Sequence, residues 1–337
     1  MESYNNSFPL DYYNELEPKE KEIYEELFYN DDNVELLEKI NIKDICMRDS
    51  IIFRDFDYNL PQNIFIINFH NGKKIVGRKI RSILRIENKI NAINCSMINS
   101  PMLLGFLKNR SKDKRQITIE YYPFTNEEKK CIFNKLISDR TFDIYYPYKY
   151  RDFYSNKEEQ SPDTGWTFNP DKKEYLGFGE THLRKFTSDF FKNIDMDNKI
   201  IYDPACSTGE FLSSLKKEYP KCYTIGHDLS QEMINYAKNY VDESCCCNAL
   251  NTPLKENSVD IMFLRFLNSE VVSTQAAYKI LKELLPKVRK KGLVVCFGHT
   301  PVLIKKEQFE KFGLKTIICN GYDKERNAIF QYYVFEV

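Results

Sequence analysis

The feature that most constrains the fold of this chain is a regular alternation of predicted strands and helices over residues 199–337. Short apolar runs typical of buried strands, such as 200–202 and 259–264, alternate with helical periodicity, as at 210–218 and 275–289. This alternation predicts an open, mostly parallel α/β sheet with helices on both faces, in which a ligand lies at the carboxyl ends of the strands. The other expected strands are 222–226, 244–247, 293–297, 316–319 and 329–335, and the other helices are 231–240 and 306–312.

A tight loop follows the first of these strands. Residues 203–211 read Asp-Pro-Ala-Cys-Ser-Thr-Gly-Glu-Phe. The small residues Ala205, Ser207 and Gly209 let the backbone approach a ligand closely, and the helix that begins next presents free N–H groups. A carboxylate or a nucleoside can bind there. Dinucleotide sites also use a glycine-containing loop after the first strand, so this loop alone leaves the cofactor open.

Further polar segments follow the later strands. Asp228 stands 19 residues after Gly209, at the end of the second strand, where a carboxylate can accept both ribose hydroxyls. The next helix opens Ser-Gln-Glu-Met at 230–233, and 248–260 reads Asn-Ala-Leu-Asn-Thr-Pro-Leu-Lys-Glu-Asn-Ser-Val-Asp. Each residue alone has an ordinary structural role, as a helix cap or a turn. Their common order and spacing favour one cofactor site.

In order and spacing, these segments resemble the motifs of class I S-adenosylmethionine-dependent methyltransferases. The loop is similar to the family's Asp-Pro-x-Cys-Gly-[Ser/Thr]-Gly-x-Phe, with Ser207 in place of a glycine. Residues 248–260 are similar to Asp-Ala-x-x-Leu-Pro-Phe-x-Asp-x-Ser-Phe-Asp; there Asn248 replaces the aspartate that holds the adenine amino group, a bond that an amide oxygen can also accept. The resemblance implies a Rossmann-like domain for S-adenosyl-L-methionine over 199–337. The implied cofactor-binding residues are Asp203, Ala205, Cys206, Ser207, Gly209, Phe211, Asp228, Leu229, Met233, Asn248, Ala249, Leu264 and Arg265.

The catalytic residues are less clearly marked than the cofactor site. Methyl transfer is an in-line displacement, so the site must align the acceptor and exclude water, and it needs a base only where the acceptor loses a proton. Candidates are His299 after the fifth strand, His182 on the helix before the first motif, and Asn268 after the fourth strand. A structural role is the alternative for each. Trp166, Tyr175 and Phe178 are candidates for an aromatic lid that attracts the sulfonium, with simple packing as the alternative.

Several reactions fit such a site, and methylation of a small molecule in specialised metabolism is the main expectation. One alternative is a cyclase that forms azetidine-2-carboxylate and methylthioadenosine from S-adenosylmethionine alone. Methylation of protein or RNA and a non-catalytic scaffold are further alternatives. Nucleic-acid amino methyltransferases carry Asn/Asp-Pro-Pro-Tyr/Phe after the fourth strand, whereas residues 263–268 here read Phe-Leu-Arg-Phe-Leu-Asn. Nucleic acid is therefore not the expected partner.

The residues before 199 predict a second domain and a junction. Helical spacing at 17–41 predicts two helices, and apolar residues on either side of Asn71-Gly72 predict a β-hairpin. A second strand pair is expected at 83–86 and 117–122. We assign 1–145 to an α+β domain that covers the substrate, 146–198 to a linker with a lid helix at 181–191, and 199–337 to the cofactor domain.

Charge is uneven along the chain although the net charge is zero. Residues 1–60 hold 16 acidic and 6 basic side chains, whereas 61–115 hold 2 acidic and 12 basic. The basic stretch 73–115 suits nucleic acid or an acidic carrier protein, or is offset by the acidic segment of the same domain. The ten cysteines are scattered, so we expect reduced thiols and no metal site. Without a signal-peptide pattern or a long apolar run, we expect a cytoplasmic protein with no membrane partner.

Overall fold

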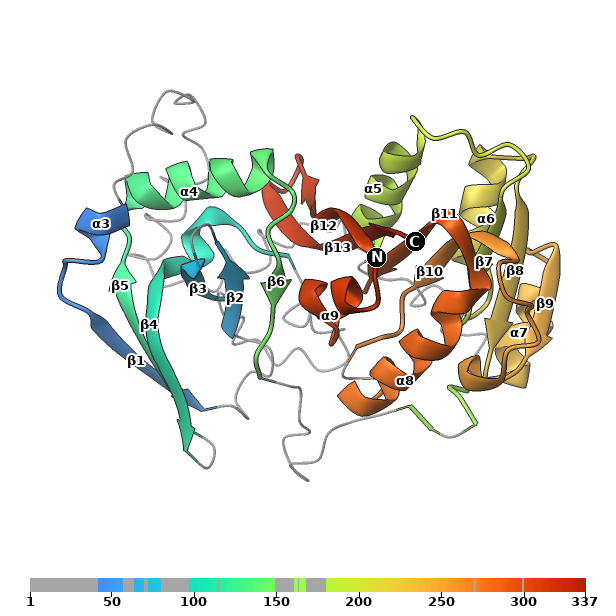
Figure 1. Ribbon diagram of the computed structural model, residues 1–337, viewed down its shortest axis with the longest axis horizontal. Coiled ribbons are helices and arrows are strands. Elements are labelled where there is room, and N and C mark those ends of the chain that lie inside the picture. Colours follow the sequence, from blue (N-terminus) through green and yellow to red (C-terminus); the bar gives the residue numbers. More distant parts are fainter. Residues whose placement is uncertain are drawn as a thin grey trace, which may run out of the picture. The chain divides into compact units, whose positions relative to one another are not determined.

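The computed structural model describes residues 42–56, 64–69, 72–79, 97–113, 116–148, 161–162, 164–167, 180–268, 271–298 and 300–337. The chain divides into two compact units (Figure 1). The first comprises Met1–Glu158 and Asn320–Gln331, and the second comprises Glu159–Cys319 and Tyr332–Val337. The helices predicted at 17–41 and the strand predicted at 83–86 lie outside the described residues.

A seven-stranded sheet forms the core of the second unit, in the order β12-β13-β11-β10-β7-β8-β9. The five adjacent strands β11, β10, β7, β8 and β9 run parallel, and β13 pairs antiparallel with β11. The mostly parallel α/β sheet is therefore as predicted. The strands are β7 Ile200–Asp203, β8 Tyr223–Asp228, β9 Glu243–Cys246, β10 Val259–Leu264, β11 Val288–Phe297, β12 Lys315–Asp323 and β13 Ala328–Glu336.

Helices pack on both faces of this sheet, because successive strand residues point to opposite sides. Phe263 of β10 contacts Phe191 of α5 and Phe211 of α6 on one face. Its neighbours Met262 and Leu264 belong to the core that holds α8 and α9 on the other (Figure 1). The helices are α5 Thr181–Phe191, α6 Glu210–Glu218, α7 Gln231–Ala237, α8 Thr274–Leu284 and α9 Lys306–Lys311.

One predicted helix is longer than the observed one. Helical periodicity was expected over 275–289, but α8 ends at Leu284 and a short 3₁₀ turn follows at Leu285–Lys287. Pro286 lies in this turn, and proline has no N–H to continue an α-helix. Strand β11 then begins at Val288, which pairs with Val259, rather than at 293. The prediction of helix as far as Arg289 is therefore wrong.

The first unit contains a six-stranded antiparallel sheet in the order β1-β5-β4-β3-β2-β6. The predicted hairpin is confirmed: β2 pairs with β3, and Gly72 in the turn has φ +71°. Helix α4 begins with a capping box between Thr125 and Glu128, and buries apolar residues that include Ile132 and Leu136. The elements are α3 Ile42–Ile45, β1 Ile51–Phe56, β2 Ile64–Asn68, β3 Lys74–Arg78, β4 Leu103–Asp113, β5 Gln116–Pro123, α4 Asn126–Ser138 and β6 Ile144–Tyr145.

The first unit also includes the tip of the β12–β13 hairpin. There the Asn320 side chain donates to the Phe142 carbonyl at 3.2 Å, and Gln331 donates to the Ile144 carbonyl at 2.7 Å. Both side chains are fully buried. Residues 320–331 thus contact the N-terminal part of the chain, although we assigned them by sequence to the 199–337 domain. Among the described helices, none is both long and apolar enough to cross a membrane.

Replacing Phe263 with alanine is expected to lower the free energy of unfolding by about 3–5 kcal/mol, because it opens a cavity among three aromatic rings. Phe263 is completely buried, with its ring centroid 4.9 Å from that of Phe211. Denaturant unfolding of both proteins measures the change. Tyr223→Ala, at a position 43% exposed on β8, is the control and should cost no more than about 1 kcal/mol. Equal losses in the two variants would contradict this packing.

Candidate active site

The loop between β7 and α6 is held in a sharp turn. The Cys206 N–H donates to the His227 carbonyl at 2.7 Å, which ties the loop to the end of β8. Ser207 and Gly209 have φ +53° and +79°, a left-handed conformation that favours glycine. A Cβ atom at Gly209 would lie 3.1 Å from the Ala237 Cα, so helix α7 also restricts this position. Burial raises the pKa of the Cys206 thiol, which keeps it protonated and unsuited to act as a nucleophile.

The Asp228 carboxylate joins this loop to the start of α7. One oxygen accepts from the Ser207 N–H at 2.8 Å, and the other accepts from the Ser230 N–H at 2.9 Å. Burial raises the pKa of Asp228, and the two N–H bonds act against that shift. Since each carboxylate oxygen has two lone pairs, the group can still accept hydroxyl donors from a ligand. Asp228 is partly exposed at the end of its strand.

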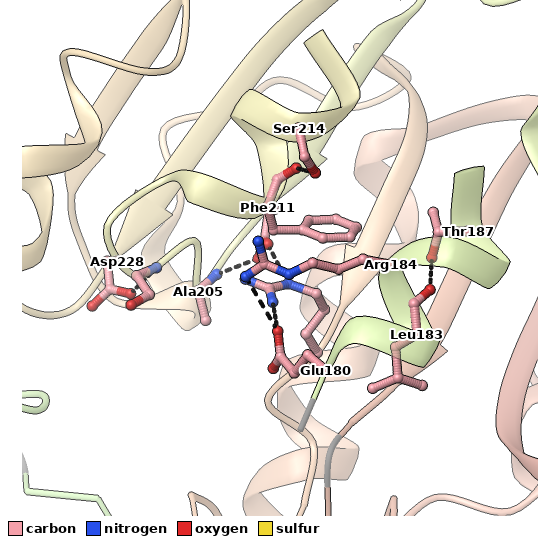
Figure 2. Close-up of polar contacts among 11 residues, drawn as sticks. Glu180, Leu183, Arg184, Thr187, Ala205, Phe211, Ser214 and Asp228 are labelled. Atoms are coloured by element: carbon pink, nitrogen blue, oxygen red, sulfur yellow. Dashed lines mark hydrogen bonds and ion pairs between the residues drawn. The ribbon is translucent and has the colours of Figure 1, made fainter. Parts of the chain in front are cut away.

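A buried cluster of charges lies at the carboxyl ends of β7 and β10. Arg265 Nε donates to Asp203 at 2.8 Å, and Arg265 Nη1 lies 3.3 Å from a Glu180 oxygen. The guanidinium also stacks over the Phe211 ring at 4.4 Å. Burial acts to lower the pKa of Arg265, but the attraction of Asp203 and Glu180 outweighs it and the net shift is upward. Figure 2 shows Glu180 and Phe211 on opposite sides of the guanidinium nitrogens at the centre of the view.

The segment after β9 begins with a 3₁₀ turn, η6 Ala249–Asn251. The Asn248 side-chain oxygen accepts from the Leu250 N–H at 2.9 Å and so caps this turn, while the side chain remains exposed. Its second lone pair can still accept from a ligand amino group. Asn248 therefore has a structural role that is compatible with the predicted binding role.

A buried polar network holds the segment that follows η6. His227 Nδ1 lies 3.1 Å from the Tyr202 hydroxyl and 3.2 Å from the Thr252 hydroxyl. His227 Nε2 is buried and has no hydrogen-bond partner among the described residues. Burial lowers the pKa of His227 from its ordinary 6.5 to about 4, so the ring is neutral near pH 7. The network connects β7, β8 and the segment that follows η6.

The predicted cofactor residues come together at one edge of the sheet. Because β10, β7, β8 and β9 are neighbours, their carboxyl ends bring four separate sequence segments side by side. Met233, Ala249 and Leu264 are buried in the walls of this region, and Leu229 is partly exposed. The Ser207 hydroxyl lies 3.5 Å from the Met233 sulfur.

Three of the six predicted catalytic and lid residues lie among the described residues. His182, in the first turn of α5, is only 5% exposed, and Asn268 is 7% exposed in the loop after β10. Trp166 is 48% exposed. His299, Tyr175 and Phe178 lie outside the described residues. All six stay predictions.

The residues next to Trp166 contact two loops of the site. Ser161 donates to the Val271 carbonyl, after β10, through both its N–H and its hydroxyl, at 3.2 and 3.0 Å. Gly165, with φ +78°, packs so closely on Ser230, after β8, that a Cβ atom would lie 2.9 Å from the Ser230 nitrogen. The contacts of Ser161 and Gly165 therefore lie after the two strands that flank β7.

Comparison with known proteins decides the family. Residues 201–292 match the model of a methyltransferase domain. Isonocardicin synthase of Nocardia uniformis subsp. tsuyamanensis is 30% identical over 278 residues, which cover 81% of this chain and 91% of that protein. The chain belongs to the class I S-adenosylmethionine-dependent methyltransferase superfamily. It is a transferase that uses S-adenosyl-L-methionine, and it shares its family with isonocardicin synthase.

Solved structures of the superfamily match less closely. An S-adenosylmethionine-dependent methyltransferase of Aquifex aeolicus is 20% identical with a TM-score of 0.38, and covers 51% of this chain and 100% of its own. A putative O-methyltransferase of Nostoc punctiforme is 12% identical with a TM-score of 0.40, and covers 49% of this chain and 59% of its own. Membership of the superfamily therefore rests on the sequence relative.

Two departures from the superfamily pattern have physical explanations. Ser207 occupies a left-handed position where the pattern has glycine, a conformation that costs a non-glycine residue roughly 1–2 kcal/mol. Thr252 stands where the pattern has leucine, and its hydroxyl joins the buried Tyr202 and His227. A buried polar network thus adjoins the predicted adenine-binding segment.

The site fits the two ends of S-adenosylmethionine. Asp228 and Asn248 offer acceptors for an adenosine, and Arg265 with Glu180 offers a cation and an anion for an amino acid group. Sequence reasoning included Arg265 but missed Glu180, which stands 23 residues before Asp203 in no recognised motif. An acidic residue directly before a predicted helix was its only signal.

Replacing Asp228 with alanine should weaken binding of S-adenosylhomocysteine at least about 10-fold, since it removes a charged acceptor and the link between two loops. Titration calorimetry measures the dissociation constant. Asp197→Ala, which removes an exposed carboxylate paired with Lys221, is the control and should bind normally. Unchanged affinity in Asp228→Ala would refute the ribose assignment.

Acidification should destabilise the protein through His227. Its folded-state pKa, about 4, lies below the ordinary 6.5, so its contribution is complete above pH 6.5 and is lost as the pH falls toward 4. Denaturant unfolding at about pH 7 and about pH 4.5 should therefore show a larger loss of unfolding free energy in the native protein than in His227→Leu. Equal losses would show that His227 titrates normally in the fold.

Proposed function

We propose that this protein transfers the methyl group of S-adenosylmethionine to a small-molecule acceptor in specialised metabolism. The observation that carries the proposal is that Ser161 and Gly165 are anchored to the loops after β10 and β8. A chain segment so anchored limits access to the carboxyl ends of the strands, where the cofactor binds. A restricted site suits a small acceptor better than a folded protein or RNA, and it helps to exclude water from the displacement.

The relative supports a role in specialised metabolism. Isonocardicin synthase is named for its product, and it matches 81% of this chain, well beyond the cofactor-binding domain alone. When bound, S-adenosylmethionine supplies an electrophilic carbon next to a sulfonium. The chain's own residues would bind the two ends of the cofactor and align the acceptor. His299, His182 and Asn268 remain the candidates for orienting the acceptor, and of these only the two histidines could remove its proton.

A second use of the cofactor has one observation in its favour. The name of isonocardicin synthase describes a product and mentions no methyl group. Attack on the methionine chain, including cyclisation to azetidine-2-carboxylate, would release methylthioadenosine instead of S-adenosylhomocysteine.

An acidic carrier protein docking on the basic stretch 73–115 and a cytoplasmic location stay predictions. Within that stretch, Lys108 is paired with Glu120 at 2.7 Å, so part of its charge is offset locally.

Product analysis separates these reactions. The purified protein is incubated with S-adenosylmethionine, alone and with a panel of phenol, amine and carboxylate acceptors, and products are followed by mass spectrometry. We expect S-adenosylhomocysteine only when an acceptor is present, together with an acceptor heavier by one methylene. Methylthioadenosine formed together with azetidine-2-carboxylate, without an acceptor, would instead establish cyclisation. Methylthioadenosine that requires an acceptor would show transfer of the methionine chain.

A further inference from the structure

We propose that Arg265 and Glu180 form a clamp for the α-amino acid end of the cofactor, with Arg265 holding its carboxylate and Glu180 holding its ammonium. This inference rests on the proposed use of S-adenosylmethionine and names the residues that select it. Glu180 would then be a specificity-determining residue. A cofactor lacking the amino acid would not engage the clamp.

Asp203 is enclosed by the protein, so within the clamp it acts by holding Arg265. It is completely buried, one of its oxygens accepts from the Ala205 N–H at 3.0 Å, and the other accepts from Arg265 Nε at 2.8 Å. A buried carboxylate needs such partners because an unpaired charge is costly there. Asp203 therefore fixes the position of Arg265 and leaves ligand contacts to the outer atoms of the guanidinium.

Arg265 has donors left after its contacts with the protein. Its hydrogen bonds to the described residues use Nε and Nη1, which leaves Nη2 to donate to a ligand. The side chain is 10% exposed, so the group is almost entirely enclosed yet not sealed. The guanidinium carbon lies 4.4 Å from the centroid of the Phe211 ring, a cation–π contact that restricts the group. A planar, fixed guanidinium is well suited to recognise a carboxylate.

Glu180 has a free acceptor in the same way. Its contacts with the described residues are with Arg265 at 3.3 Å and Arg184 at 3.6 Å, and both use Oε2. Oε1 can therefore accept from an ammonium group. The Glu180 side chain is 18% exposed, slightly more than that of Arg265. A donor on Arg265 and an acceptor on Glu180, held side by side, complement a carboxylate and an ammonium carried on one carbon.

The clamp also lies at the right end of the site. Asp228, predicted to bind the ribose, is bonded to the Ser207 N–H, whereas Asp203 and Arg265 lie at the other side of the same loop. Figure 2 shows Asp228 and Glu180 on opposite sides of Ala205. A cofactor with its adenosine at Asp228 and its amino acid at Glu180 would place its sulfonium between them, along the β7–α6 loop.

Two ligands that share an adenosine test the clamp. S-adenosylhomocysteine carries the amino acid and 5′-methylthioadenosine lacks it, so the ratio of their affinities reports on the clamp alone. We expect Glu180→Gln, which keeps the shape of the side chain, to weaken S-adenosylhomocysteine binding about 10-fold and to leave methylthioadenosine within about twofold. Arg265→Lys should change the ratio in the same direction, because lysine lacks the planar fork. Titration calorimetry measures both affinities.

The control is Glu218→Gln, which makes the same chemical change on the surface of α6, where Glu218 accepts from Ser188. It should alter neither affinity. Should Arg265→Lys fail to fold, Glu180→Gln alone decides. An unchanged affinity ratio in Glu180→Gln, whether both ligands weaken or neither does, would overturn the clamp and leave the proposed function intact. Failure of the native protein to bind either compound would overturn the proposed function and the clamp with it.

Discussion

The buried ion pair between Asp203 and Arg265 is the interaction on which the rest of the site depends. Asp203 ends β7, in the middle of the sheet, where an unpaired carboxylate would be very unfavourable. Arg265 reaches it from the neighbouring β10, so the two strand ends are fixed relative to each other. The second Asp203 oxygen shapes the loop through Ala205. One carboxylate thereby sets both the turn and the position of a cation.

Much of the fold could be predicted from local sequence. The predicted bounds of α6 Glu210–Glu218 and β10 Val259–Leu264 are those observed, because apolar periodicity and short apolar runs report directly on burial. The loop from Asp203 to Gly209 was also identifiable, since close backbone approach requires small residues. The end of α8 was predicted too late, because the prediction followed the helical spacing of apolar residues and did not end the helix before Pro286.

The contacts of the site could not be predicted in the same way. Glu180 reaches Arg265 across 85 positions of sequence, and no spacing rule links an acidic residue before one helix to a cation after a distant strand. The Asn248 oxygen was expected to face adenine, yet it also caps its own turn through Leu250. Likewise, nothing local indicates that Thr252 shares a histidine with Tyr202. Long-range polar contacts depend on the packed fold.

The shared hairpin has a consequence for how the protein is made. Residues 320–331 belong to the first unit, although the rest of that unit ends at Glu158. A ribosome releases the N-terminal part first, and domains commonly fold in that order. Here the first unit lacks Asn320 and Gln331, with their buried bonds to the backbone around Ile144, until residues 159–319 of the second unit have also emerged. Its folding is therefore completed only after Gln331 has been translated, and a single cut cannot separate the two units.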